Sequence, residues 1–129
     1  MPLVRIDLQE GRTPGEVRTV ADTVQEVMRE VFAAPPRDRY QIVTVHPRGQ
    51  IIAEDSGLGF SRSDDIVIIQ IFQQGRTREN KVAAYALLAE RLHERTGLDP
   101  NDLVVSIMTN DQEDWSFCAG EAQFLDGTL

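Results

Sequence analysis

The sequence contains few residues of several types, and each shortage excludes some classes of protein or binding partner. Its single cysteine, Cys118, cannot form a disulfide within one chain, which fits a reducing cytoplasm. Acidic residues outnumber basic ones, and the formal net charge of −8 argues against partners such as nucleic acid or an anionic membrane surface. Apolar runs are only a few residues long, too short to cross a bilayer. A cytoplasmic globular protein of 129 residues, folded as a single domain, is expected.

Residues that commonly hold metals or cofactors are equally sparse. The two histidines, His46 and His93, fall on different predicted elements without ligand spacing, so no metal site is expected. Cys118 has no evident base near it in the sequence, which favours an incidental thiol over a nucleophile. The segment Gly57-Leu58-Gly59 neither follows a convincing strand nor opens a helix, which argues against a dinucleotide-binding loop.

The chain enters a strand pattern at once, because Val4, Ile6 and Leu8 alternate with charged residues. Proline at position 2 normally permits removal of Met1, which would leave the Pro2 nitrogen as a free secondary amine. The reference pKa of an α-amino group, about 7.7–8.0, lies well below that of lysine. Pro2 is therefore a candidate general acid or base near neutral pH, or simply an efficiently processed terminus.

Two amphipathic helices are predicted, each beginning after a threonine cap. The first starts at Thr13 and ends before Pro35, and the second starts at Thr77 and ends at Gly97. Each helix lies between two segments of strand character, an arrangement that favours a parallel, right-handed β-α-β connection. The strands are expected over residues 1–8, 42–45, 66–72 and 103–108.

These two units are an internal duplication. Gly11-Arg12-Thr13 aligns with Gly75-Arg76-Thr77, and Pro36-Arg37-Asp38 aligns with Pro100-Asn101-Asp102 at the same offset. The predicted fold is α+β: one domain, 1–129, of two β-α-β repeats (about 1–47 and 66–108), with a C-terminal hairpin or arm over 109–129. Four strands would form a mixed sheet, with both helices on one face.

The strand over 66–72 is apolar on both faces, which is typical of a strand that is covered on both sides. Two helices can cover only one face of the sheet. A contiguous apolar sheet surface exceeds what monomers usually expose. We therefore expect a closed homo-oligomer with the sheets packed inward.

A terminal proline, a duplicated β-α-β unit and an inward-facing sheet together resemble the tautomerase superfamily. Within it, the chain resembles the malonate semialdehyde decarboxylase group over nearly its whole length. The matching landmarks are Pro2, Glu10-Gly11-Arg12-Thr13, Asp38-Arg39-Tyr40-Gln41, His46, Glu54-Asp55 with Gly57-Leu58-Gly59, and Asp114-Trp115-Ser116-Phe117 with Phe124-Leu125.

The resemblance implies a homotrimer without metal or organic cofactor, acting on a small anionic oxoacid. It implies that Pro2 is the catalytic amine, that Asp38 assists it or positions a water, and that Arg76 holds the substrate carboxylate. A second arginine of the family falls on Gln74, whose neutral amide lacks the charged fork of a guanidinium. Losing that arginine would weaken carboxylate binding by roughly 1–3 kcal/mol.

The resemblance also implies an apolar wall of the substrate site, formed by the aromatic residues Tyr40, Trp115, Phe117 and Phe124. The three in the tail can equally be core residues.

Two of the implied catalytic residues also have a purely structural interpretation. Asp38 alone would be interpreted as a turn residue, like its repeat mate Asp102. Arg76 could be an ordinary first-turn residue, although a cation is unfavourable at a helix N-terminus and suggests a nearby anion.

Three functions are consistent with these residues. The first is decarboxylation of a small 3-oxoacid by protonated Pro2, with hydration of an unsaturated acid as a side activity. The second is keto-enol tautomerisation of a phenylpyruvate or 2-hydroxydienoate type of substrate, with neutral Pro2 as general base. The third is a catalytically silent oligomeric interaction module, which retention of Met1 would favour because an acylated proline nitrogen cannot react.

Overall fold

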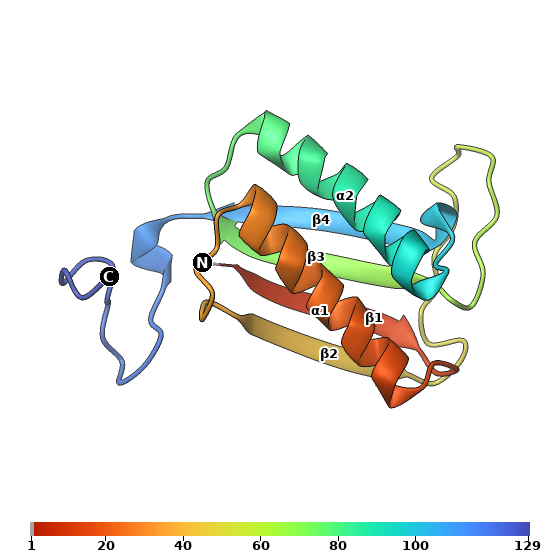
Figure 1. Cartoon of the computed structure of the whole chain (residues 1–129), viewed down its shortest axis with the longest axis horizontal. Coiled ribbons are helices and arrows are strands. Elements are labelled where there is room, and N and C mark those ends of the chain that lie inside the picture. The colour runs from red at the N-terminus through yellow and green to blue at the C-terminus, as the bar shows by residue number, and fades with distance from the viewer. Residues whose placement is uncertain (1) are drawn as a thin grey trace.

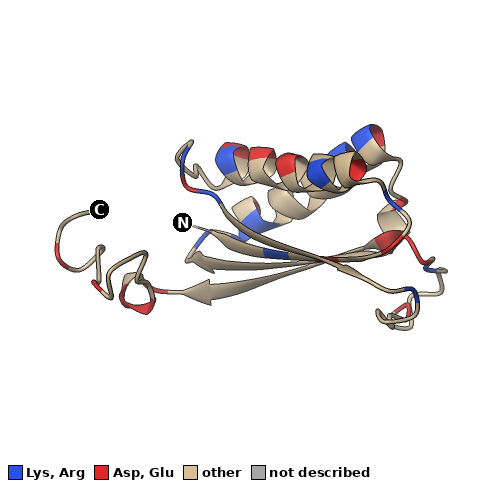
Figure 2. Ribbon diagram, turned by 90° about the horizontal axis from the view of Figure 1, so that it is seen from below, with Lys and Arg blue, Asp and Glu red and all other residues tan. Residues whose placement is uncertain are grey.

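A computed structural model of the protein describes residues 2–129. Four strands form one mixed sheet in the order β2-β1-β3-β4, and both helices lie on one face of it (Figures 1 and 2). The predicted α+β fold is confirmed. The elements are β1 (Leu3–Gln9), α1 (Pro14–Val31), β2 (Tyr40–His46), β3 (Val67–Gln74), α2 (Arg78–Thr96) and β4 (Leu103–Asn110).

Both helices begin where the threonines predict. The side-chain oxygen of Thr13 accepts a hydrogen bond from the backbone N–H of Glu16 (3.2 Å), and Thr77 does the same for Asn80 (3.1 Å). At the other end of α2, Gly97 adopts the left-handed conformation (φ 73°). These local signals fix where each helix starts and stops before any packing is considered.

The two repeats are joined by their first strands. β1 pairs with β2 in parallel, β3 pairs with β4 in parallel, and β1 pairs with β3 antiparallel. Because the central pair is antiparallel, the second repeat runs in the opposite direction to the first. Residues that match in the two repeats therefore lie at opposite ends of the sheet.

The offset that relates the two helix caps does not hold in the first strand of each repeat. Leu3 pairs with Tyr40, and Ile68 pairs with Val104, so Leu3 corresponds to Ile68. The offset that relates the first strands of the two repeats is thus one residue larger than the offset that relates the helix caps. The cause is the connection before each helix, which spans 10–13 in the first repeat and only 75–77 in the second.

The core lies between the sheet and the two helices. Alternate residues of β1 and β3 point into it, and one face of each helix closes it. Burying apolar side chains at roughly 25 cal/mol per Å² is the main stabilisation of such a layer. Fully buried members include Val4, Ile6, Leu8, Val24, Val27, Met28, Ile69, Ile71, Leu88 and Leu92.

The opposite face of the sheet is uncovered in the single chain. The register brings Leu3, Tyr40, Phe72 and Met108 into one row across all four strands of that face. Each of these side chains is partly or largely exposed. Charged residues are concentrated on the helices and loops, with few on the sheet (Figure 2). The face is therefore a broad surface with apolar rows.

The C-terminal segment is an arm that extends past the end of β4 (Figure 1). It contains a short 3-10 helix over Gln112–Asp114 followed by turns, and no strand is found among residues 111–129. Within residues 2–129, no helix is long and apolar enough to cross a membrane.

Candidate active site

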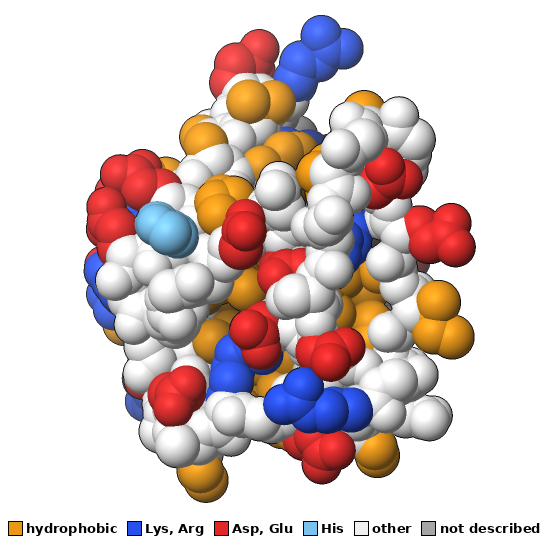
Figure 3. All heavy atoms as spheres, turned by 90° about the vertical axis from the view of Figure 1, so that its right-hand side faces the viewer, with side chains coloured by type: hydrophobic (Ala, Val, Ile, Leu, Met, Phe, Trp, Pro, Cys, Tyr) orange, Lys and Arg blue, Asp and Glu red, His pale blue; other side chains and the backbone are white. Residues whose placement is uncertain are grey.

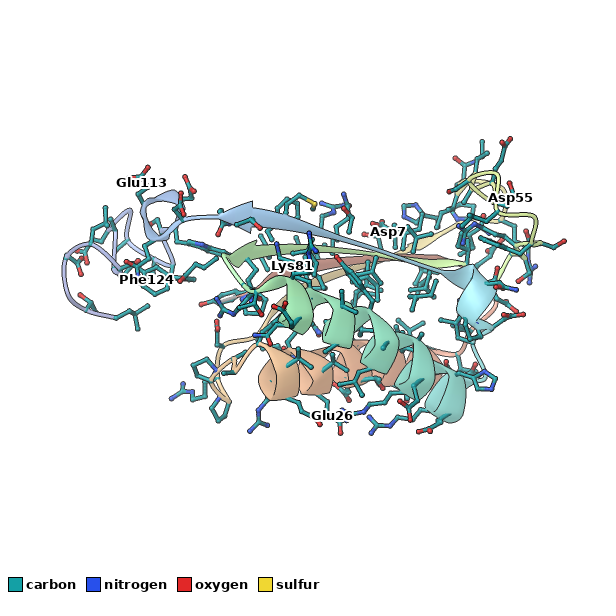
Figure 4. All side chains as sticks on the ribbon, turned by 90° about the horizontal axis from the view of Figure 1, so that it is seen from above. Asp7, Glu26, Asp55, Lys81, Glu113 and Phe124 are labelled. Atoms are coloured by element: carbon teal, nitrogen blue, oxygen red, sulfur yellow. The ribbon has the colours of Figure 1, made fainter. Side chains whose placement is uncertain are left out.

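One end of the sheet collects most of the residues singled out in the sequence. β1 and β2 start there, β3 and β4 end there, α1 ends there and α2 begins there (Figure 1). The arm leaves β4 at the same end, with Phe124 lying in the part beyond the sheet (Figure 4). The topology thus joins segments from the beginning, middle and end of the chain. We call this end of the molecule the Pro2 end.

Pro2 is buried at the entrance to β1. Its neighbour Leu3 pairs with Tyr40 on one side and with Phe72 on the other. Extending both ladders by one residue brings Pro2 beside Arg39 and Gln73. Pro2 therefore lies one residue before the central strand β1, in line with the strands on either side of it.

Asp38 lies just before β2 and is only 4% exposed. Its backbone is held on both sides: its N–H donates to the carbonyl of Pro35 (3.0 Å), and its carbonyl accepts from Nε2 of Gln25 (3.3 Å). Burial raises the pKa of the Asp38 carboxyl, while nearby positive charge, including the guanidinium of Arg76, acts to lower it. A carboxyl in this setting is suited to holding or passing a proton.

Arg76 lies in the loop between β3 and α2 and reaches the end of α1. Its Nη2 donates to the carbonyl of Phe32 (3.3 Å), and its Nη1 donates to the carbonyls of Gln74 (3.3 Å) and Gly75 (3.1 Å). The charge centre lies 6.0 Å from the centre of the Phe32 ring. These contacts hold a cation at the Pro2 end, within electrostatic range of Asp38.

The carbonyl of Phe32 is available to Arg76 because of how α1 ends. Ala33 adopts the left-handed conformation (φ 53°), and the N–H of Ala34 donates back to the carbonyl of Met28 (3.3 Å). This Schellman-type ending stops the helix before Pro35. Alanine in that conformation is strained by about 1–2 kcal/mol relative to the right-handed helix.

The four predicted aromatic residues form one cluster. The rings of Trp115 and Phe117 are stacked (centres 5.3 Å apart, 11° between planes), Phe124 meets Phe117 edge-on at 5.4 Å, and Tyr40 lies 5.8 Å from Phe117. Gln123 fastens the arm, because its amide oxygen accepts from the N–H of Phe117 (2.9 Å). The cluster links the arm to the start of β2.

Gln74 lies on the side of the sheet that the helices do not cover. Its register partner on β4 is Asn110, whose side-chain oxygen accepts from Nε1 of Trp115 (2.9 Å). Gln74 is therefore near the aromatic cluster, whereas Pro2 and Gln73 lie on the helix-facing side. A role for Gln74 in substrate binding remains a prediction.

Gln73 is the residue that the sequence analysis misses. It is 1% exposed, and neither polar atom of its side-chain amide has a hydrogen-bond partner among the described residues. An unsatisfied buried amide costs about 1–3 kcal/mol. The available signal is the alternation in β3, where Gln73 continues a buried series that is otherwise apolar: Val67, Ile69 and Ile71.

Two cavities of the single chain lie away from the predicted catalytic residues. One beside α1 is lined in part by Asp22, Glu26 and Arg39. Another lies at the opposite end of the sheet, where it includes Arg12 and Asp102, and Figure 3 shows acidic and basic side chains mixed over that end. Neither cavity includes Pro2, Asp38 or Arg76, and Pro2 and Asp38 are themselves buried.

The chain belongs to the tautomerase superfamily. A family model described as tautomerase enzyme matches residues 38–118, and a second with the same description matches residues 2–61. Probable tautomerase YrdN of Bacillus subtilis (strain 168) is 47% identical over 129 residues, which is all of both chains. Probable tautomerase YusQ of the same organism is 30% identical over 127 residues, 98% of this chain and 100% of that one.

Solved structures agree with this assignment and confirm the superfamily resemblance. A malonate semialdehyde decarboxylase, studied in wild-type, mutant and inactivated forms, is 38% identical with a TM-score of 0.93 over 98% of each chain. FG41 malonate semialdehyde decarboxylase, inhibited by 3-bromopropiolate, is 45% identical with a TM-score of 0.94 over 98% of this chain and 97% of that one. A fused 4-OT, described as a symmetric trimer, shares the fold at 18% identity (TM-score 0.79, covering 97% and 98%).

Proposed function

We propose that this protein is a cofactor-independent enzyme that decarboxylates a small 3-oxoacid with the amine of Pro2, after Met1 has been removed. The observation that carries the proposal is the meeting of buried Pro2, buried Asp38 and the Arg76 cation at one end of the sheet. The similarity to two malonate semialdehyde decarboxylases at 38% and 45% identity supports this substrate class.

Arg76 binds the substrate carboxylate in this proposal. Its guanidinium is held at the Pro2 end by three backbone carbonyls, and a carboxylate is a stronger acceptor than any of them. The aromatic cluster of Tyr40, Trp115, Phe117 and Phe124 forms an apolar wall beside it. Keeping water away from the bound carboxylate strengthens the electrostatic interactions inside the site.

Pro2 creates the electron sink for the bond that breaks, in one of two ways. The protonated amine donates a hydrogen bond to the substrate carbonyl oxygen, which takes up the electrons; or the amine, after passing its proton to a neighbouring group, attacks the carbonyl carbon and gives an iminium and water, with the iminium nitrogen taking up the electrons. The bond to the carboxylate carbon then breaks, its electron pair forms an enol or enamine, and carbon dioxide leaves. A proton returns to the carbon, and where an iminium formed, water hydrolyses it to the aldehyde and the free amine.

Asp38 transfers the proton or positions the water in these steps. Burial raises the pKa of its carboxyl, so it exchanges a proton closer to neutral pH than an exposed aspartate does. The same carboxyl, paired with cationic Pro2, could hold a water for addition to an unsaturated acid. Decarboxylation and hydration thus use one set of groups.

A second function is supported by the curated relatives, which are named as probable tautomerases. In that reaction, neutral Pro2 removes a proton from an enol or an adjacent carbon and returns it elsewhere. The two functions need opposite protonation states of one amine. Titration of Pro2 separates them: a pKa well above neutrality favours decarboxylation, and one below neutrality favours tautomerisation.

We also propose a homotrimer. The uncovered sheet face calls for a second surface, and a structural relative is a symmetric trimer. Light scattering on the purified protein should give the mass of three chains. Phe72→Lys, which puts a charge on the central strand β3 within the uncovered face, should lower that mass.

The deciding experiment begins with the intact mass of the purified protein, which reports whether Met1 has been removed. The processed protein and Pro2→Ala are then assayed with malonate semialdehyde, a phenylpyruvate enol and 3-haloacrylates. Turnover by the wild-type chain that collapses in Pro2→Ala supports the proposal. Equal turnover by both proteins removes proline from the mechanism, and retained Met1 together with no turnover favours the silent oligomeric module.

A further inference from the structure

Gln73 occupies a position that the other repeat fills with an apolar residue. The correspondence that relates Leu3 to Ile68 also relates Leu8 to Gln73 and Pro2 to Val67. At the end of the sheet away from Pro2, Leu8 and Val67 pair across the central strands, and both are fully buried. The fold therefore accommodates leucine here, and the amide of Gln73 is not required for packing.

The nearest place for a partner of this amide is the space beside Pro2. Both polar atoms are buried within the single chain and have no hydrogen-bond partner among the described residues. The cross-strand position next to Gln73 on the β1 side is that of Pro2, and such pairs have Cβ atoms about 4.5–5.5 Å apart. On the β4 side, Gln73 pairs with Thr109, whose hydroxyl oxygen accepts a hydrogen bond from Nζ of Lys81 (3.1 Å).

Removal of Met1 supplies the missing donor. An acylated proline nitrogen has no hydrogen to donate, whereas the free amine of Pro2 carries one hydrogen when neutral and two when protonated. Because Met1 is bonded to Pro2, its removal both creates the donor and opens space next to it. The amide oxygen of Gln73 is the buried acceptor on the neighbouring strand.

We propose that Gln73 is a positioning residue for the Pro2 amine: its side-chain oxygen accepts a hydrogen bond from the protonated amine and favours that form. This inference rests on the proposed use of Pro2 as the reacting group. A hydrogen bond to the charged form of a group stabilises that form, so Gln73 raises the affinity of Pro2 for its proton. Gln73 thereby biases the site toward chemistry that needs a cationic amine.

Other charged groups lie on the elements that meet at this end and act alongside Gln73. Asp38 lies just before β2 and Arg76 in the loop after β3, within electrostatic range of each other, whereas Arg39 donates to Asp22 and Gln41, and Lys81 of α2 donates to Thr109. The end of α1 contributes the carbonyl of Phe32, which is occupied by Arg76. These groups are unchanged when Gln73 alone is replaced, so a variant at this position isolates its contribution.

The test is a titration of the Pro2 amine in the processed protein, by NMR of ¹⁵N-labelled proline or by the pH dependence of inactivation with 3-bromopropiolate. In Gln73→Leu, the pKa of Pro2 should fall by about one unit, because a hydrogen bond to a charged group is lost. In Gln73→Glu it should rise, since a carboxylate takes the place of the amide. Gln73→Met serves as a second apolar variant if leucine prevents folding.

Stability separates this role from a structural one. In the processed protein, Gln73→Leu should unfold within a few degrees of the wild type, because the lost hydrogen bond to the amine is offset by removing the amide nitrogen, which still has no partner, and by placing the residue that the other repeat uses. Its pH profile of kcat/KM should shift with the amine. A glutamine that served only packing would give the reverse, with lower stability and an unmoved profile.

The matched control is Gln50→Leu, which makes the same change on an exposed loop and should leave the titration and the activity as they are. An unmoved Pro2 pKa in a folded Gln73→Leu or Gln73→Met overturns the inference. That result is distinct from failure of the proposed function, which Pro2→Ala reports, because the titration reads the amine whether or not a substrate turns over.

Discussion

Asp38 and Asp102 occupy the same place in the two repeats, each just before a second strand, and each is 4% exposed. Asp102 accepts hydrogen bonds from both the backbone N–H and the hydroxyl of Ser63, each at 2.6 Å. Asp38 instead has a pKa raised by burial and lies within electrostatic range of Arg76. One duplicated carboxylate secures a loop, and the other is the one for which we propose a role in the reaction.

The surroundings explain this difference. At the far end of the sheet, residues of the long loop that leads into β3 fill the space: Ser63 binds Asp102, and the carbonyl of Asp65 accepts from Arg12 (2.6 Å). At the Pro2 end, the matching residues Asp38 and Arg76 lie where Pro2 enters β1. A duplicated fold therefore does not give two equivalent sites, because what precedes each first strand differs.

Among substitutions that test the difference between the two ends of the sheet, Pro2→Ala is expected to have the largest effect on activity. Pro2→Ala should lower kcat/KM by about 10²- to 10⁴-fold, the usual contribution of a positioned acid or base. Val67→Ala, at the equivalent position of the second repeat, should instead reduce the free energy of unfolding by about 2 kcal/mol through lost core volume and leave activity per folded molecule unchanged. Steady-state kinetics and denaturant titration measure the two effects. Comparable activity loss in both variants would contradict the assignment.

The next largest effect is expected for Asp38→Asn, which should differ from Asp102→Asn in both activity and stability. The first should lower kcat by about 10²-fold, whereas the second should keep its activity and lose about 1.5–3 kcal/mol of stability with the charge-assisted bonds to Ser63. Kinetics combined with thermal unfolding at one pH separate the two. The comparison fails if Asp102→Asn is the variant that loses activity.

The Asp38 carboxyl also predicts a dependence of stability on pH. Its folded-state pKa lies above the unfolded value, so the folded chain binds the proton more tightly. The contribution to stability is present below the unfolded pKa and is lost as the pH rises through the folded pKa. Asp38→Asn should therefore unfold at an equal or higher temperature than the wild type at neutral pH, and the gap should close in acid.

A smaller effect is expected at the arginines. Arg76→Ala should raise KM by about 10- to 100-fold, since a charge-assisted hydrogen bond to the substrate contributes about 1.5–3 kcal/mol. Arg12→Ala, its repeat mate, should leave KM unchanged because its guanidinium donates to the carbonyl of Asp65 at the far end. Substrate saturation curves for the two variants provide the measurement. Equal KM values in the two variants would remove Arg76 from substrate binding.

The smallest expected effect concerns how the two helices end. Ala33 (φ 53°) and Gly97 (φ 73°) are repeat mates in the left-handed conformation. Ala33→Gly should raise the free energy of unfolding by up to about 1 kcal/mol, because relief of strain exceeds the added entropy of the unfolded chain. Gly97→Ala should lower it by about 1 kcal/mol. Chemical denaturation resolves both signs, and a loss of stability in Ala33→Gly would mean that the alanine is not strained.

Much of the fold is readable from local sequence. The threonine caps at 13 and 77, the left-handed Gly97 and the apolar alternation of the strands act over a few residues, and the structure has each element where these signals fall. The aromatic residues of the tail were recognisable as a group, and they do form one cluster with Tyr40. Their spacing left core and pocket as equal alternatives, because spacing carries no information on which neighbours they meet.

The role proposed for Gln73 has no comparable local signal. A glutamine after an apolar strand is typical of the end of that strand, and the family resemblance points instead to its neighbour Gln74, as a replaced arginine. Only the register of β1 with β3 brings Gln73 beside Pro2, and only the burial of its amide reveals that a partner is missing. Strand register depends on contacts between distant segments, so no local pattern specifies it.

The sequence by itself determined the elements and their order, because caps, turns and periodicity act between residues close together in the chain. It also determined the superfamily, since a terminal proline and a duplicated β-α-β unit survive as patterns. The antiparallel pairing of β1 with β3 was decided by the tertiary structure alone. That pairing sends matching residues to opposite ends, and buries Asp38 near Arg76 while Ser63 engages Asp102.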